Sequence, residues 1–469
     1  TLPNISSSVL PSSRSWRRLG EHGIRRLCPQ INTTEEGAGM APRRSPRLPP
    51  QIQASEDGTG ATHRRRRRRR SPRLHHQTHA SEDLAGVTCQ RPRRSRPTSL
   101  PDNDDMMREI LLRLPPLPSS LTRASAVCRR WRRLVTDPKF LCSFRAHHRK
   151  PPLLGVFQES RQGVVFIPVL DPPDRIPPAC FDLGRCSRSY GYDVLGCRHG
   201  RVLLKDRKRN EAVVCDPITG EQHWLDFPPD FKRVDANGAV LCAALDHGHV
   251  NHSCHGSPFK VVLVSMYTND KQILACVYSS ETGLWGNLIA TGVPCEISNS
   301  KPAVLIGNCL YWLSFEDTIL KFDLDENSLI VMRGPPVTSS ISYENRQIVQ
   351  TVDGDVGYAV SSYLCFQIWR RNVIGHGVVT WKPWKTIELQ KIFRLSCRLV
   401  HEQLIGYCED VDVVFFHVGF TVYMVQLKSM QSRELYEIKS DMRCHPFTSF
   451  YIPGTTINGG NRSEMLHDT

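Results

Sequence analysis

Residues 102–135 of the chain read DNDDMMREILLRLPPLPSSLTRASAVCRRWRRLV, and this stretch decides how the molecule is organised. It opens with three aspartates, and acidic side chains stabilise the N-terminus of a helix. The apolar residues that follow are spaced to share one helical face, and they are Met107, Ile110, Leu111 and Leu114. Because three prolines follow by position 118, the pattern predicts a helix over 102–114 that stops there.

Two more helices are predicted directly downstream. The second covers about 120–135, and its apolar stripe consists of Leu121, Ala124, Val127, Trp131 and Leu134. The third begins at Asp137-Pro138, because an N-cap aspartate followed by proline at the first helical position is a typical helix start. Three short helices within so few residues form one small unit.

From residue 150 onward the chain consists of short β-branched and aromatic runs with turn signals between them, which is the pattern of a β-rich domain. Four examples are GRVLL at 200–204, AVVC at 212–215, KVVLV at 260–264 and VVFF at 413–416. We expect these runs to be strands.

A pattern of an apolar strand followed by a polar turn recurs in this part of the chain. It reaches its turn at Asp216, at Ser279 and, more loosely, at Asp323, which gives spacings of 63 and 44 residues. Repeats of roughly 50 residues are typical of kelch-like propeller blades with four strands each. The region would then supply six or so blades.

The helical stretch resembles the F-box as it occurs in a large plant family. The matching residues are Leu100-Pro101, Arg108 to Leu114, Arg123 to Val135 and Phe144 to His148. Three later stretches resemble the kelch-like F-box-associated β-propeller domain of the same family, namely LGCRHGRVLL at 195–204, CVYSSETG at 276–283 and GNCLYWL at 307–313. The resemblance covers roughly residues 99–455.

This resemblance implies a substrate-recognition subunit of a Skp–cullin–F-box E3 ubiquitin ligase, which is not itself an enzyme. The F-box would dock on a Skp-type adaptor and, through it, on cullin, while the β domain would hold an unknown target protein. By position, the adaptor contacts fall on Leu100, Pro101, Ile110, Leu111, Leu114, Val127, Cys128 and Trp131. The family pattern has two fewer residues before the Arg108 run, so Asn103-Asp104 is an insertion that alters this edge.

Other interpretations of these features stay open. The apolar face of the helices also fits the core of a small bundle that binds nothing. A propeller scaffold that keeps an F-box without joining a ligase, or that associates with nucleic acid through its basic tail, is the alternative function. Copurification with the adaptor distinguishes these possibilities.

The net charge of +15 is concentrated at the N-terminus. Residues 1–98 hold 20 Lys and Arg against 7 Asp and Glu, whereas residues 151–469 hold 30 against 34. The Arg-, Ser- and Pro-rich composition of 1–98 buries too little apolar surface to fold, so we expect a disordered tail. Its run Arg64–Arg70 suggests nuclear import or phosphate binding, so the expected location is nucleus or cytoplasm. Nucleic acid is not expected as the main partner.

Motifs for catalysis, cofactors and metals are not found. The 17 cysteines are scattered and include no CxxC pair, which indicates a reducing compartment. Histidines and a cysteine cluster between His247 and His255, but their spacing fits no standard zinc motif, so the segment is interpreted as a surface loop. We expect no cofactor and no metal. No apolar run approaches the ~20 residues of a membrane helix, so no membrane association is expected.

Six tryptophans lie in the β domain, namely Trp224, Trp285, Trp312, Trp369, Trp381 and Trp384. Most are expected to pack the blades, and one or two to face the central mouth of the propeller as substrate anchors, since tryptophan is enriched in binding hot spots.

The predicted fold is α+β and multidomain. It comprises a disordered tail at 1–98, a three-helix F-box at 99–149, an all-β propeller-type domain at 150–455 and a flexible tail at 456–469.

Overall fold

The computed structural model describes residues 104–452, with gaps at 232–235, 244–255, 267–271, 298–299, 337–340, 363–364, 375–377, 395–401 and 439–442. Several predictions lie outside these residues: both tails, the run Arg64–Arg70, the positions Leu100 and Pro101, and the histidine cluster at 247–255. Within the described ranges no helix has the length and apolar character needed to cross a membrane.

Four helices form the N-terminal part of the described chain: α2 (Asp104–Leu112), α3 (Pro118–Val127), α4 (Arg129–Thr136) and α5 (Pro138–His148). The prediction of a single second helix was therefore wrong. Cys128 has an extended backbone (φ −161°, ψ 169°) that ends α3, and its Sγ accepts a hydrogen bond from the Trp131 amide at 3.5 Å, which caps α4. The predicted start of the last helix is confirmed, because the Asp137 carboxylate accepts from the Lys139 amide at 3.2 Å.

The helices bury one shared core. Its fully enclosed members are Leu111, Leu121, Ala124, Leu134, Val135, Phe140, Leu141 and Phe144. They come from all four helices, and the parts of the predicted apolar faces that turn inward are those at Leu111, Leu121, Ala124 and Leu134. Arg108 of α2 also pairs with the capping Asp137 at 3.2 Å, which ties the first helix to the start of the last.

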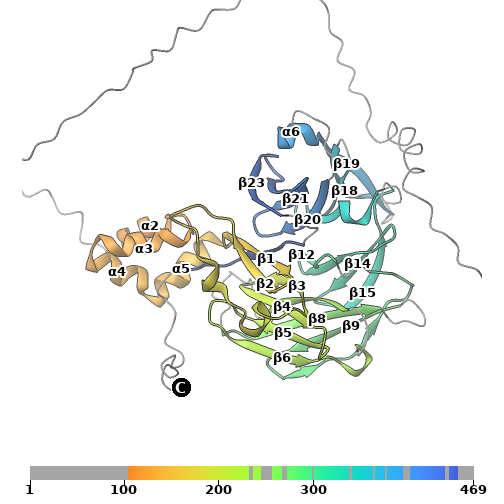
Figure 1. Ribbon diagram of the computed structural model, residues 1–469, viewed down its shortest axis with the longest axis horizontal. Coiled ribbons are helices and arrows are strands. Elements are labelled where there is room, and N and C mark those ends of the chain that lie inside the picture. Colours follow the sequence, from red (N-terminus) through yellow and green to blue (C-terminus); the bar gives the residue numbers. More distant parts are fainter. Residues whose placement is uncertain are drawn as a thin grey trace, which may run out of the picture. The chain divides into compact units, whose positions relative to one another are not determined.

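The remaining described residues form six sheets, the blades of a β-propeller (Figure 1). One blade combines β1 (Leu153–Ser160), β2 (Gly163–Pro168) and β24 (His445–Thr448). The next contains β3 (Tyr192–Arg198), β4 (Arg201–Asp206), β5 (Glu211–Cys215) and β6 (Gln222–Asp226). The third contains β7 (Ala236–Cys242), β8 (Phe259–Met266), β9 (Ile273–Ser279), β10 (Leu284–Trp285) and β11 (Ile289–Ala290).

The other three blades have four strands each. The fourth blade contains β12 (Val304–Ile306), β13 (Cys309–Leu313), β14 (Thr318–Asp323) and β15 (Ser328–Arg333). The fifth contains β16 (Arg346–Gln350), β17 (Val356–Ser361), β18 (Cys365–Ile374) and β19 (Val378–Glu388). The sixth contains β20 (Glu402–Cys408), β21 (Val413–Val418), β22 (Thr421–Gln426) and β23 (Ser432–Glu437). Short helical pieces connect them: α6 (Leu389–Phe393) and the 3-10 turns η2 (Pro178–Phe181), η3 (Gly184–Ser187), η4 (Pro229–Phe231) and η7 (Tyr343–Asn345).

The inner strand of each blade lines the centre of the ring, and the two ends of the domain close it. The inner strands are β3, β7, β12, β16, β20 and β24, and β24 lies beside both β20 and β3. Strand β24 comes from the C-terminal end and pairs antiparallel with β1 from the N-terminal end, for example Phe157 with His445. Joining both ends in one blade removes the open edge that an incomplete ring would leave.

The repeated polar turn is confirmed as a structural repeat. Ser279 and Asp323 end the third strand of their blades and Asp216 directly follows the third strand of its blade, and each of the three starts the turn to the fourth strand. The fifth residue of each turn has a positive φ, and these residues are Gly220, Gly283 and Asn327. The structure adds a fourth turn of this kind, from Gln426 to Met430, where the sequence keeps neither the acidic start nor the glycine.

Five of the six tryptophans pack the blades, and none lies at the central mouth. Trp312 is fully buried, and the indole N–H groups of Trp285 and Trp381 donate to the carbonyls of Asp226 and Arg333 in the preceding blades, at 2.8 and 2.9 Å. None of the six lies on an inner strand, so the expectation of a tryptophan anchor at the mouth was wrong. The most exposed of them, Trp384 at 41%, is on the outer strand β19.

Candidate functional site

An exposed apolar face on the helical module is the first candidate site. Met106 and Ile110 lie four residues apart on α2, so they share one side of the helix. Both remain about half exposed, at 48% and 47%. Neither side chain packs into the core of the module. Large apolar side chains left in water on so small a unit indicate a surface that a partner covers.

The break between α3 and α4 adds to this exposed surface. Val127 is 62% exposed, and Cys128 beside it is also exposed. Leu114 and Trp131 are half-buried, because each rests against the core while keeping part of its side chain in solvent. Five of the predicted adaptor positions are thus accessible, namely Ile110, Leu114, Val127, Cys128 and Trp131.

Leu111 is the exception among the described adaptor positions. Its side chain has no exposed surface and packs in the centre of the core, so it stabilises the module and is not available for contact. Periodicity placed Leu111 and Ile110 on one face, but adjacent helical residues point about 100° apart. Met106, which sequence reasoning did not select, lies on the exposed side with Ile110. Leu100 and Pro101 lie outside the described residues.

Of the inserted pair Asn103-Asp104, the structure describes Asp104. Asp104 is the first residue of α2, and its carboxylate accepts from Arg130 Nε of α4 at 2.8 Å. The insertion therefore contributes a helical residue and a cross-helix ion pair. Arg133, three residues after Arg130 on α4, is exposed as expected.

The centre of the propeller is filled by polar side chains. Arg198 at the end of β3 forms a two-point ion pair with Glu409, with Nη2 and Oε2 3.0 Å apart, and also donates to the Ala303 carbonyl. The Lys301 ammonium donates to the carbonyls of Glu344, Arg346 and Leu404 at 2.6 to 2.9 Å. Burial lowers the pKa of Lys301 to about 7, while the neighbouring Glu344 carboxylate acts in the opposite direction.

The space left between these groups is very small. A cavity of about 30 Å³ lies between Arg198, Glu409, Asp410 and His445. That volume fits a single water molecule. The His445 side chain is buried, neither of its nitrogens has a partner among the described residues, and burial lowers its pKa to about 3. Among the described residues, side chains therefore fill the centre of the ring and leave no room there for a ligand larger than a water molecule.

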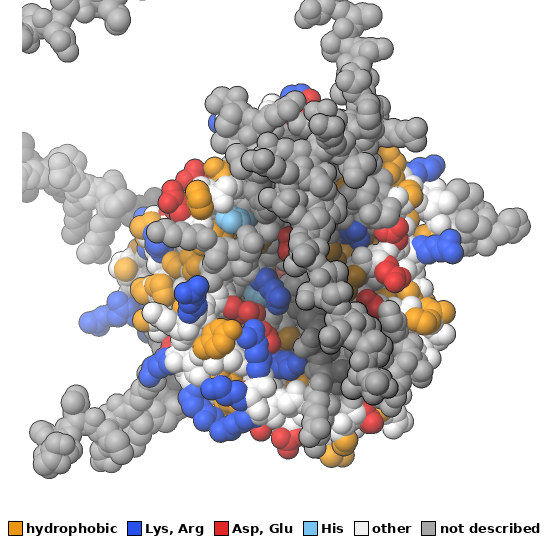
Figure 2. Space-filling view, turned by 45° about the vertical axis from the view of Figure 1, so that its right-hand side comes forward, with side chains coloured by type: hydrophobic (Ala, Val, Ile, Leu, Met, Phe, Trp, Pro, Cys, Tyr) orange, Lys and Arg blue, Asp and Glu red, His pale blue; other side chains and the backbone are white. Residues whose placement is uncertain are grey.

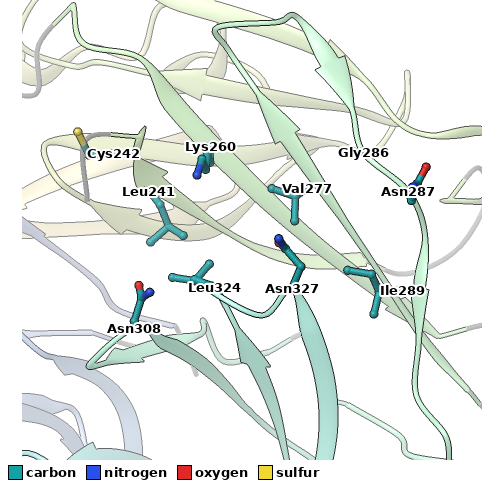
Figure 3. A pocket seen from close by; sticks show the side chains of 10 residues that line it. All are labelled: Leu241, Cys242, Lys260, Val277, Gly286, Asn287, Ile289, Asn308, Leu324 and Asn327. Carbon is teal, nitrogen blue, oxygen red and sulfur yellow. The ribbon is translucent and has the colours of Figure 1, made fainter. Parts of the chain in front are cut away.

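A larger pocket of about 440 Å³ opens between the third and fourth blades (Figure 3). Its lining residues are Leu241, Cys242, Lys260, Val277, Gly286, Asn287, Ile289, Asn308, Leu324 and Asn327. None of them was predicted as a site residue, because the pocket residues lie on six separate segments with no local motif. Across the face seen in Figure 2, hydrophobic side chains form small groups among charged ones.

In the described part of the chain, no group of three or more His, Cys, Asp and Glu side chains is placed to hold a metal ion.

Comparison with known proteins assigns the chain to a family. An F-box domain matches residues 99–143, and the family described as F-box protein AT5G49610-like, beta-propeller, matches residues 193–454. The chain belongs to this F-box and β-propeller family. The propeller match covers β24 and the strands of the other five blades. It leaves out only β1 and β2, which share a sheet with β24.

Three Arabidopsis thaliana proteins show the extent of the similarity. F-box protein At3g22700 is 31% identical over 29% of this chain and 39% of its own length. F-box/kelch-repeat protein At3g61590 is 27% identical over 45% and 51%. F-box protein At5g49610 is 22% identical over 75% of this chain and 97% of its own length. The chain thus aligns with about half or less of the first two relatives and with nearly all of the third.

Proposed function

We propose that this protein is the substrate-recognition subunit of a Skp–cullin–F-box E3 ubiquitin ligase. The exposed apolar face of the F-box helices would dock on a Skp-type adaptor, and the propeller would hold the protein to be ubiquitinated. The observation that carries this proposal is the exposure of Ile110 and Val127, at 47% and 62%, in the segment that matches the F-box domain.

The protein's own role in the reaction is to position the target and not to catalyse. The ubiquitin-conjugating enzyme of such a ligase brings the reactive cysteine, so the propeller needs only affinity and orientation. We further propose that the protein works in the nucleus or the cytoplasm, where its many unpaired cysteines stay reduced.

Adaptor affinity tests the docking half of this proposal. Burial of an aliphatic side chain at an interface is worth roughly 1.5–3 kcal/mol, and a carboxylate in its place adds a desolvation cost. Ile110→Asp should therefore weaken binding to a purified Skp-type adaptor about a hundredfold or more, as measured by calorimetry. Because Ile110 lies outside the core, the melting temperature should stay close to that of the unaltered protein.

The matched control is Arg133→Ala, an exposed position on the neighbouring helix α4 that should change affinity less than about twofold. If Ile110→Asp and Val127→Asp both fold and both bind the adaptor as the unaltered protein does, the proposal fails. An unaltered protein that does not bind the adaptor would instead favour a scaffold outside the ligase.

A further inference from the structure

The pocket between the third and fourth blades lies on one face of the propeller. Strand β7 ends at Cys242 and β8 begins at Phe259 on the edge where β9 turns to β10. In the next blade the β12–β13 turn with Asn308 and the β14–β15 turn with Asn327 reach the same pocket. Turns from two blades thus converge on one space, and Figure 3 shows the lining side chains of both blades around it.

The floor of the pocket is apolar and rigid. Leu241 is buried in the core between the two blades, and Val277, Ile289 and Leu324 pack against that same core while remaining partly exposed. Side chains that are held by a core keep their positions when a ligand enters. The volume of about 440 Å³ is within the usual range for ligand sites and accommodates an aliphatic side chain with its adjoining backbone.

Three amides and one ammonium surround this floor. Within the described ranges, the side chains of Asn287, Asn308, Asn327 and Lys260 make no hydrogen bond or ion pair with the rest of the chain. An asparagine side chain offers both donors and an acceptor, which is what the N–H and C=O groups of an extended peptide require. Among the described residues that line the pocket, only Lys260 is charged, and it selects for an anion.

The surface beside the pocket favours a macromolecular partner. The outer edge of the third blade is reduced to the two-residue strands β10 and β11, and the segment between them lines the pocket. Leu284, Leu288 and Val293 on this edge are 69%, 42% and 50% exposed. A bound small ion would leave these three side chains in water, whereas a polypeptide can cover them.

We infer that this pocket binds an extended peptide segment that carries an aliphatic side chain next to an aspartate or glutamate. The aliphatic group enters the space above Leu324 and Val277, the asparagines satisfy the peptide backbone, and the carboxylate pairs with Lys260. The inference deepens the proposed function, on which it rests for the assignment of the peptide to a target protein.

Synthetic peptides test the inference directly. The probes are fluorescein-labelled hexapeptides Gly-Ser-X-Z-Ser-Gly, in which X is Leu, Ile or Ala and Z is Glu, Asp, Gln or Lys, titrated with the full chain and followed by fluorescence polarisation. Peptides with Leu or Ile before Glu or Asp should bind about tenfold more tightly than those with Ala or with Gln at these positions. Equal affinity across the set overturns the inference.

Two variants locate the binding in the pocket. Lys260→Gln should remove the preference for Glu over Gln, whereas Lys208→Gln, the same change on an exposed turn of the second blade, should leave it intact. Asn308→Trp, at a half-buried turn position, should block the pocket and abolish binding of every peptide while the melting temperature is kept. Binding that survives both Lys260→Gln and Asn308→Trp overturns the inference.

Failure of this inference can be distinguished from failure of the proposed function. Adaptor affinity depends on the F-box helices, and neither pocket variant should change it. Loss of peptide binding with normal adaptor binding therefore rejects only the pocket, whereas peptide binding without adaptor binding rejects only the ligase.

Discussion

Arg198 and Glu409 are 211 residues apart in the sequence and form a two-point ion pair at the centre of the propeller. The same Glu409 carboxylate accepts from the Leu305 amide at 2.7 Å, and Arg198 also donates to the Ala303 carbonyl at 3.1 Å. One pair therefore links the inner strand β3, the start of β12 and the end of β20. Its partners come from three of the six blades, so the pair joins parts of the ring that local sequence does not connect.

Removal of Glu409 should destabilise the propeller strongly. Glu409→Ala leaves the Arg198 guanidinium, which is only 7% exposed, without its counter-charge and leaves the Leu305 amide unpaired. Breaking a buried pair from one side costs about 3–5 kcal/mol. We expect a drop of this size in the unfolding free energy from urea titration.

The control for this prediction is Arg188→Ala, which breaks the exposed pair between Arg188 and Asp182, with side chains 76% and 36% exposed. Its cost should stay below about 1 kcal/mol. Equal effects of the two substitutions would show that the central pair is no more important than a surface one.

Lys301 should have a similar role in joining blades. Lys301→Met removes three hydrogen bonds to the carbonyls of Glu344, Arg346 and Leu404 and leaves buried acceptors unpaired. Each unpaired buried group costs about 1–3 kcal/mol, while the loss of a buried charge offsets part of this. The expected net loss is about 2 kcal/mol or more, seen as a lower melting temperature. A variant as stable as the unaltered protein would mean that the buried charge costs as much as its hydrogen bonds contribute.

Asp410 should make the stability pH-dependent. Burial, followed by the charge of Glu409, raises the pKa of Asp410 from 3.8 to about 6 in the folded protein. Above pH 6 the folded state carries an ionised Asp410 at a cost, and between pH 6 and pH 4 it gains a proton that the unfolded chain does not bind. The Asp410 contribution to stability therefore improves as the pH falls through this range.

Asp410→Asn should accordingly stabilise the protein at pH 7 by at most about 3 kcal/mol, with the difference vanishing near pH 4. Urea titrations of both proteins at pH 4, 5, 6 and 7 measure this. A gain that is the same at all four pH values would contradict an assignment to the Asp410 proton.

The neighbours Ile110 and Leu111 should respond in opposite ways to truncation. Leu111→Ala opens a cavity in the helical core and should destabilise the F-box module by about 2–5 kcal/mol. Ile110→Ala removes a side chain that is half in solvent and should cost less than about 1 kcal/mol, while still weakening adaptor binding. Circular dichroism melting and adaptor titration of the two variants separate their roles. A Leu111→Ala protein that folds normally would contradict the buried position.

The F-box assignment and the propeller fold were predictable from local patterns. The capping aspartate and proline at 137–138 mark a helix start whatever surrounds them, and the recurring turns at Asp216, Ser279 and Asp323 reflect a backbone requirement for an αL residue five positions into the turn. The break at Cys128 was missed, because neither proline nor glycine marks it and its cap is a cysteine sulfur.

Capping, periodicity and turn geometry act over a few residues, so the kind and order of most elements were predictable from the amino-acid pattern. Which side of α2 is enclosed was not predictable in this way, because the burial of Leu111 and the exposure of Ile110 depend on where the other helices pack. Ring closure by β24, the pairing of Arg198 with Glu409 and the pocket around Lys260 join residues that are tens to hundreds of positions apart. No local pattern encodes such contacts, because the free energy that forms them comes from packing whole blades together.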